Sequence, residues 1–210
     1  MSVRVKICGI TCIEDAQAVA LAGADALGFQ FVKRSPRYVS AQQAAQIIQT
    51  LPPFVTTVGV FLDPQPEVVR EVLEIAALDV LQFHGNESAE LCASFGRPYL
   101  KVIPVKGPLG VEQLQSEYAD AQALLLDTWA DGQSGGTGQS FDWSLWPHGA
   151  TMPLVLAGGL TPDNVAEAIL ATRPYAVDVS GGVEGDQPGR KSAVQVRRFI
   201  AEVRRVERTA

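Results

Sequence analysis

The chain has 210 residues, of which 47 % are hydrophobic and 19 % charged, with a formal net charge of −6. This composition suits one globular domain with a sizeable core, and the acidic balance argues against the basic surface that general nucleic-acid binding requires. The N-terminus lacks the apolar run of a signal peptide, and no stretch approaches the roughly 18 apolar residues of a membrane helix. We therefore expect a cytoplasmic protein without nucleic-acid or membrane partners.

Short apolar, β-branched runs alternate along the chain with segments of helical periodicity. The runs predict eight strands, at residues 3–8, 24–31, 55–62, 78–84, 98–103, 121–127, 153–158 and 175–180. Helices are predicted in between or after them, at 12–24, 40–51, 66–77, 87–95, 111–119, 161–171 and 191–206. Start signals support several of these helices: Glu14 and Asp15 in a first turn, Ser40 as an N-cap, and Pro66 near the first helical position.

Eight strands, each followed by a helix or by a loop in its place, indicate a parallel sheet. Eight such units in 210 residues predict a single α/β domain over 1–210, a small (β/α)₈ TIM barrel. A doubly wound open sheet is the main rival, although it usually has fewer strands. The one long irregular segment, 127–143, is a candidate functional loop.

Strand alternation predicts which side chains point into the barrel. In the first strand, Val5 and Ile7 suit the outer face against helices, so Lys6 and Cys8 are expected to point inward. The same test places six further polar residues inward: Gln82, His84, Lys101, Asp127, Asp178 and Ser180. These groups cluster towards the C-terminal ends of strands, where barrel active sites lie.

Structural roles compete with catalytic ones at these positions. A buried inward Lys6, Lys101 or Asp178 can be half of a core ion pair, and His84 can simply bond a carbonyl group. For Asp127 and Cys8 both readings stay open, with the catalytic one favoured by their place at the last strand position before a glycine-containing loop.

The cysteines differ by position. Cys8 ends a strand at the predicted barrel mouth, whereas Cys12 opens a helix with no histidine or further cysteine nearby to complete a metal shell. Three cysteines cannot all pair in disulfides. We interpret Cys12 and Cys92 as packing residues and expect no metal site.

Two glycine-rich turns follow the seventh and eighth predicted strands, where this fold recurrently binds phosphate. Gly158 and Gly159 lie in the first turn, and Ser180, Gly181 and Gly182 in the second. Paired glycines let backbone N–H groups approach an anion without obstruction by a Cβ atom. A third glycine-rich piece, 135–139, is a flexible loop or a lid that contacts substrate.

The chain resembles the phosphoribosylanthranilate isomerase family of tryptophan biosynthesis, whose barrels are of the ribulose-phosphate-binding type. The matching pieces span nearly the whole chain in the family's order: KICGIT (6–11), EDA (14–16), GFQFVKRSPRYVS (28–40), LQFHG (81–85), LLLDT (124–128), GGTGQSFDW (135–143), LAGGLTPDNV (156–165) and VDVSGGVE (177–184). Two positions depart from the family pattern, since Gly181 replaces a frequent second serine and Ser192 a usual acidic residue.

The resemblance implies an Amadori rearrangement of N-(5-phosphoribosyl)anthranilate to 1-(2-carboxyphenylamino)-1-deoxyribulose 5-phosphate. It implies Asp127 as general acid, Cys8 as general base, and Arg37 as the clamp for the anthranilate carboxylate. The other expected substrate-binding residues are Gln82, His84, Gly158, Gly159, Asp178, Ser180, Gly181 and Gly182. No cofactor is expected because the iminium intermediate is itself the electron sink, and the small phosphosugar substrate is the expected partner of a monomer or homodimer.

Other barrels remain as alternatives. The histidine-pathway aminoaldose isomerase has an aspartate where Cys8 stands, and indole-glycerol-phosphate synthase has a longer N-terminal extension. A non-catalytic phosphometabolite-binding barrel is the alternative of a different class, against which Cys8, Asp127 and Arg37 argue. We also expect Lys6, on the same strand face, to favour the thiolate form of Cys8.

Overall fold

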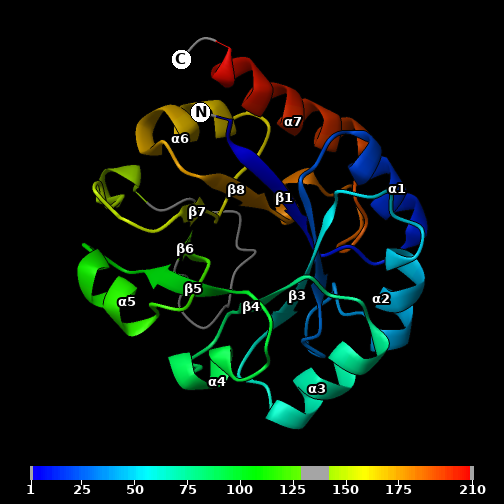
Figure 1. The fold of residues 1–210 in the computed structure, drawn as a ribbon. Coiled ribbons are helices and arrows are strands. Elements are labelled where there is room, and N and C mark those ends of the chain that lie inside the picture. Colours follow the sequence, from blue (N-terminus) through cyan, green and yellow to red (C-terminus); the bar gives the residue numbers. More distant parts are fainter. Residues whose placement is uncertain (1, 129–141, 209–210) are drawn as a thin grey trace.

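The structure is a computed structural model that describes residues 2–128 and 142–208. Eight parallel strands form a closed barrel in chain order, β1 to β8, with helices around the outside (Figure 1). Strand β1 pairs with β2 on one side and with β8 on the other. This closure confirms the predicted TIM barrel and excludes the doubly wound open sheet.

All eight strands lie within the predicted segments or within two residues of them. They are β1 (Arg4–Cys8), β2 (Ala26–Gln30), β3 (Thr56–Phe61), β4 (Val80–Phe83), β5 (Tyr99–Val105), β6 (Ala123–Thr128), β7 (Leu154–Leu156) and β8 (Ala176–Val179). The α-helices are α1 (Ile13–Leu21), α2 (Ala41–Ile48), α3 (Pro66–Ile75), α4 (Ala89–Ala93), α5 (Val111–Glu117), α6 (Val165–Thr172) and α7 (Ala193–Glu207).

Two short 3₁₀ helices lie in connections. One, η1 (Trp143–Leu145), precedes β7, and the other, η2 (Gly181–Val183), follows β8. Most of the long segment between β6 and η1, including the glycine-rich piece 135–139, lies outside the described residues. Over the two described ranges, no helix has both the length and the apolar character needed to cross a membrane.

Helices α2 and α3 begin where the sequence signals place them, whereas α6 begins at Val165 and not at the predicted residue 161. Ser40 caps α2 by accepting a hydrogen bond from the Gln43 N–H, and Pro66 occupies the start of α3. Ser192, one of the two departures from the family pattern, caps α7 by accepting from the Gln195 N–H. The cap at this position is therefore preserved without an acidic side chain.

Alternation along the strands separates two apolar layers. The outer faces pack against the helices, as at Leu81, Phe83 and Leu124, and belong to the large hydrophobic core. The inner faces form a second, smaller cluster within the barrel: Leu100, Val102, Ala123, Leu125, Val155, Ala157 and Ala176. The inner apolar cluster fills the barrel below the polar strand ends.

The structure corrects one inward assignment. Lys101 lies on the outer face of β5, because its neighbours Leu100 and Val102 belong to the inner cluster. Its ammonium group is buried and donates to the Glu87 carboxylate at 2.9 Å and to the Gly85 carbonyl at 2.6 Å. Burial of a lysine against helices is tolerable here because a buried acid and a carbonyl group satisfy it.

This outward ion pair predicts a stability role. Removing one partner of a buried pair leaves the other uncompensated, so Lys101→Met is expected to lower the free energy of unfolding by about 3 kcal/mol. Urea denaturation monitored by circular dichroism measures the effect. Arg198→Met, which breaks the exposed pair with Asp163, is the matched control and is expected to change stability little. An unchanged unfolding free energy for Lys101→Met contradicts this assignment.

Candidate active site

One cavity of about 720 Å³ opens at the C-terminal ends of the strands. Its lining includes every site residue expected from the sequence: Cys8, Arg37, Gln82, His84, Asp127, Gly158, Gly159, Asp178, Ser180, Gly181 and Gly182. The sequence did not single out Gln30 from β2 or Val60 from β3, which also line it. The candidate residues are therefore brought together in one cavity.

Glycines at the end of β1 and in β2 make room for the Cys8 thiol. Cys8 lies in register with Gly28 of β2, and a Cβ atom at Gly28 would approach the Cys8 sulfur to 2.8 Å. The chain then turns, with Gly9 at φ +80°, and the N–H groups of Gly9 and Ile10 both donate to the Gly28 carbonyl. The turn thus fixes the thiol at the cavity wall.

Lys6 and Asp178 form a buried ion pair beneath the cavity. They lie in register on β1 and β8, and Lys6 Nζ donates to Asp178 Oδ2 at 2.8 Å. Burial lowers the pKa of Lys6, but Asp178 and Cys8 outweigh burial and leave the pKa raised. The prediction that Lys6 is half of a core ion pair is therefore confirmed. Asp178, its partner, also lines the cavity.

The Cys8 thiol experiences opposing influences. Burial raises its pKa, the ammonium groups of Lys6 and Lys191 act in the lowering direction, and Asp178 adds to the rise. The net direction is upward. Lys6 therefore acts in the expected sense, but it does not overcome burial.

His84 and Asp127 meet across the cavity floor. His84 Nε2 lies 3.2 Å from Asp127 Oδ2, and the Thr128 N–H donates to Asp127 Oδ1 at 2.8 Å. The carboxyl plane is thereby fixed from both sides. His84 contacts a titratable side chain here, rather than the carbonyl group that the structural alternative suggested.

Several buried polar atoms on the cavity wall have no hydrogen-bond partner among the described residues. They are Gln82 Oε1, Asp178 Oδ1 and Ser180 Oγ. Unsatisfied buried polar atoms are costly in a folded protein. Because these atoms line one cavity from β4 and from the end of β8, they are candidates for bonding a polyhydroxylated ligand.

The loops after β7 and β8 meet through glycine. Gly158 and Gly159 have positive φ values, +87° and +62°, and within the described chain neither N–H donates a hydrogen bond. A Cβ atom at Gly182 would overlap the Leu160 carbonyl oxygen, so the two loops touch only because this residue is glycine. The arrangement is that of a backbone cradle for an anion.

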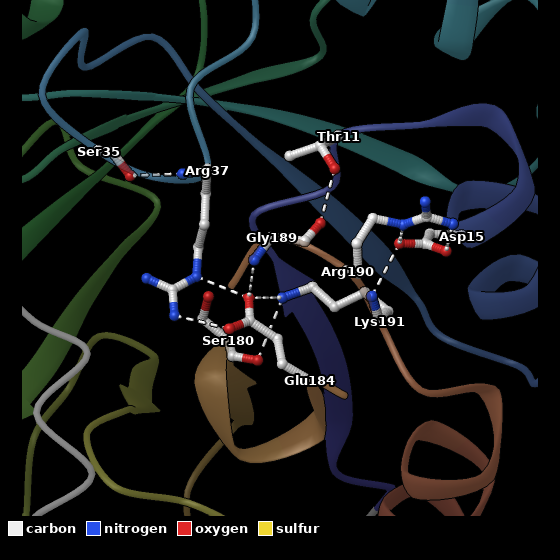
Figure 2. Close-up of polar contacts among 9 residues, drawn as sticks. All are labelled: Thr11, Asp15, Ser35, Arg37, Ser180, Glu184, Gly189, Arg190 and Lys191. Carbon is white, nitrogen blue, oxygen red and sulfur yellow. Dashed lines mark hydrogen bonds and ion pairs between the residues drawn. The ribbon is translucent and has the colours of Figure 1, made fainter. Parts of the chain in front are cut away.

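Arg37 reaches the cavity from the β2–α2 connection and is held by Glu184. Its Nε and Nη2 donate to the two Glu184 carboxylate oxygens at 2.7 and 2.8 Å, and Lys191 contacts the same carboxylate (Figure 2). Neither Glu184 nor Lys191 was expected at the site from the sequence. Glu184 ends the VDVSGGVE motif, but no sequence signal identifies Arg37, 147 residues away, as its partner.

The remaining cysteines are free thiols. Cys92 is fully buried in α4, as expected for a packing residue, whereas Cys12 is only partly buried at the N-cap of α1. Within residues 2–128 and 142–208, no group of three or more histidine, cysteine or acidic side chains is arranged to hold a metal ion.

A closed eight-stranded barrel with one polar cavity at the carboxyl ends of its strands is the architecture of a (β/α)₈-barrel enzyme. Within that class, a model of the N-(5'-phosphoribosyl)anthranilate (PRA) isomerase family matches residues 5–202. The chain belongs to this family and is an isomerase.

Individual relatives agree with the family match. The N-(5'-phosphoribosyl)anthranilate isomerase of Pseudomonas fluorescens strain Pf0-1 is 54 % identical over 97 % of this chain and 99 % of its own. The solved phosphoribosyl anthranilate isomerase of Thermotoga maritima is 42 % identical, with a TM-score of 0.87 over 96 % of this chain and 98 % of that one.

A further solved phosphoribosyl anthranilate isomerase contains reduced 1-(o-carboxyphenylamino)-1-deoxyribulose 5-phosphate. It is 41 % identical, with a TM-score of 0.84 over 96 % of this chain and 98 % of its own. The bound compound carries a phosphate, a polyhydroxylated chain and an aromatic carboxylate, which gives three kinds of group to compare with the cavity.

The opposing influences on Cys8 give a test of the Lys6 contribution. Lys6→Met removes a cation that favours the thiolate, so the pKa of Cys8 is expected to rise further. The rate of alkylation against pH, measured in a Cys12→Ser background, reports this shift because the thiolate is the reacting form. Arg4→Met, on the same strand but paired with the partly exposed Asp25, is the matched control. An unchanged profile for Lys6→Met removes the proposed coupling.

Proposed function

We propose that this chain converts N-(5-phosphoribosyl)anthranilate to 1-(2-carboxyphenylamino)-1-deoxyribulose 5-phosphate, a step of tryptophan biosynthesis. The observation that carries the proposal is one cavity lined together by a thiol, a histidine-paired carboxyl, an arginine and two glycine loops. The reaction needs no external oxidant or reductant, because C2 of the sugar is oxidised while C1 is reduced within the same molecule.

Asp127 is the proposed general acid for the first step. Protonation of the furanose ring oxygen breaks its bond to C1 and leaves an iminium ion between C1 and the anthranilate nitrogen. The Thr128 N–H fixes one carboxyl oxygen, and His84 lies beside the other. This geometry supports a role for His84 in orienting the proton that Asp127 delivers.

Cys8 is the proposed general base for the second step. Removal of the C2 proton by the thiolate sends the C2–H electron pair towards the iminium and gives an enolamine, which tautomerises to the ketone. In the closed order of strands, β1 and β6 are separated by β7 and β8. Base and acid therefore face the cavity from different sides, as sequential proton transfers at C2 and at the ring oxygen require.

The remaining residues are proposed to hold the substrate. The glycine cradle after β7 and β8 suits the phosphate, and the unpartnered atoms of Gln82, Asp178 and Ser180 suit the sugar hydroxyls. The Arg37 guanidinium suits the anthranilate carboxylate. These three recognition elements match the chemistry of the compound bound in the solved relative.

Removal of the acid or base tests the mechanism. Cys8→Ser and Asp127→Asn are each expected to reduce kcat by about 100-fold or more, because general acid–base groups contribute 10² to 10⁴. The decrease of anthranilate-type fluorescence as substrate is consumed measures the rate. Cys12→Ser removes a neighbouring thiol that lies outside the cavity lining and is expected to retain full activity. A Cys8→Ser protein as active as the parent chain rules out Cys8 as the base.

The carboxylate clamp has its own kinetic signature. Arg37→Met is expected to raise KM about tenfold to 100-fold, the range for loss of a charged hydrogen bond, with a smaller effect on kcat. Initial rates over a range of substrate concentrations separate the two constants. A variant with a lowered kcat and an unchanged KM assigns Arg37 to the chemical step instead.

A further inference from the structure

We propose that Glu184 is a positioning residue, which holds Arg37 so that one edge of its guanidinium faces the substrate carboxylate. The inference deepens the proposed function and rests on the proposed role of Arg37. Glu184 lies directly after η2, whereas Arg37 lies in the β2–α2 connection. The ion pair therefore joins two loops that are far apart in sequence, on either side of β1.

The planar shape of the guanidinium determines how it can bind two carboxylates at once. Arginine carries five N–H donors in one plane, which form a side edge through Nε and Nη2 and an end edge through Nη1 and Nη2. Glu184 accepts from Nε and Nη2 at 2.7 and 2.8 Å and so occupies the side edge. The end edge is left for a second carboxylate, with bidentate geometry.

Glu184 is itself held in place. Its Oε1 atom accepts from Lys191 Nζ at 2.9 Å and from the Gly189 N–H at 3.1 Å, and Figure 2 shows the carboxylate between Arg37 and Lys191. Burial raises the pKa of Glu184, but the two cations outweigh burial and leave it lowered. The carboxylate therefore stays ionised and in place, and so can hold the Arg37 guanidinium in one orientation.

Lys191 is the second cation that contacts the Glu184 carboxylate. Its side chain is fully buried, and Nζ also donates to the Ser180 carbonyl at 3.1 Å. One carboxylate between two cations leaves one net positive charge at this wall of the cavity. A substrate carboxylate on the free edge of Arg37 balances that charge, so Glu184 orients the clamp without neutralising it.

The backbone around Arg37 restricts the side chain but does not fix the guanidinium. A Cβ atom at Gly9 would lie 2.5 Å from Arg37 Cδ, and one at Gly181 would lie 3.3 Å from Nη2. The two glycines thus leave a slot for the side chain. Among the described residues, the hydrogen bonds of the guanidinium go to the two carboxylate oxygens of Glu184.

The test compares two ligands that differ only in the carboxylate. One is reduced 1-(o-carboxyphenylamino)-1-deoxyribulose 5-phosphate, and the other is its phenylamino counterpart without the ring carboxylate. Calorimetry on the parent chain is expected to show at least about a tenfold preference for the carboxylated ligand. Glu184→Gln is expected to lose most of that preference and to bind the counterpart within about threefold of the parent affinity.

Three further variants separate positioning from loop stability. Arg37→Met is expected to lose the same preference, and Glu184→Gln combined with Arg37→Met is expected to lose no more than either alone. Asp15→Asn is the matched control, because Asp15 holds the same loop through the Lys191 N–H and the Arg190 side chain without contacting Arg37. It is expected to keep the preference.

The failures are distinguishable. If Glu184→Gln keeps the parent preference, or weakens both ligands equally, the positioning role is overturned while the clamp role of Arg37 stands. If parent and Arg37→Met show the same preference, the proposed role of Arg37 is wrong and the inference falls with it. Should Glu184→Gln fail to fold because Lys191 is left unpaired, Glu184→Gln with Lys191→Met removes both buried charges and gives the same comparison.

Discussion

The pairing of β1 with β8 is the constraint on which the rest of the structure depends. It closes the barrel, places Lys6 opposite Asp178, and brings the turn after Cys8 against the loop that leads into α7, where the Thr11 hydroxyl donates to the Gly189 carbonyl. A slip of one residue would turn Cys8 to the helix side and bury Val5 and Ile7 with the polar groups. The observed register brings the two buried charges of Lys6 and Asp178 together, and a slip of one residue would separate them.

Strand alternation was enough to predict most of the polar side chains that the strands contribute to the cavity. It placed Cys8, Gln82, His84, Asp127, Asp178 and Ser180 correctly, because in each of these strands the other face is clearly apolar. It failed at Lys101, since the rule that outer faces are apolar is only statistical. Glu87, in the loop after β4, satisfies the lysine within the outer layer, and no periodicity within β5 carries information about that loop.

In the loops, too, some site residues could be predicted from their residue type, whereas others are recognised only from the contacts that the fold creates. Gly158, Gly159 and Gly182 were recognisable because glycine itself permits the backbone conformations and contacts that the cradle needs. Glu184 was not, because its partner Arg37 is 147 residues away. The Glu184 carboxylate can contact Arg37 only because barrel closure places the two loops side by side, as Figure 2 shows.

The charges around the cavity also connect the two proton transfers of the proposed reaction. Burial raises the pKa of the Cys8 thiol, and the cations of Lys6 and Lys191 offset this effect only in part. In the proposed mechanism, ring opening by Asp127 creates a cationic iminium next to the carbon from which Cys8 would take a proton. An adjacent positive charge favours the thiolate over the thiol. In the proposed mechanism, ring opening therefore offsets part of the effect of burial on the pKa of Cys8, and the acid step favours the base step that follows it.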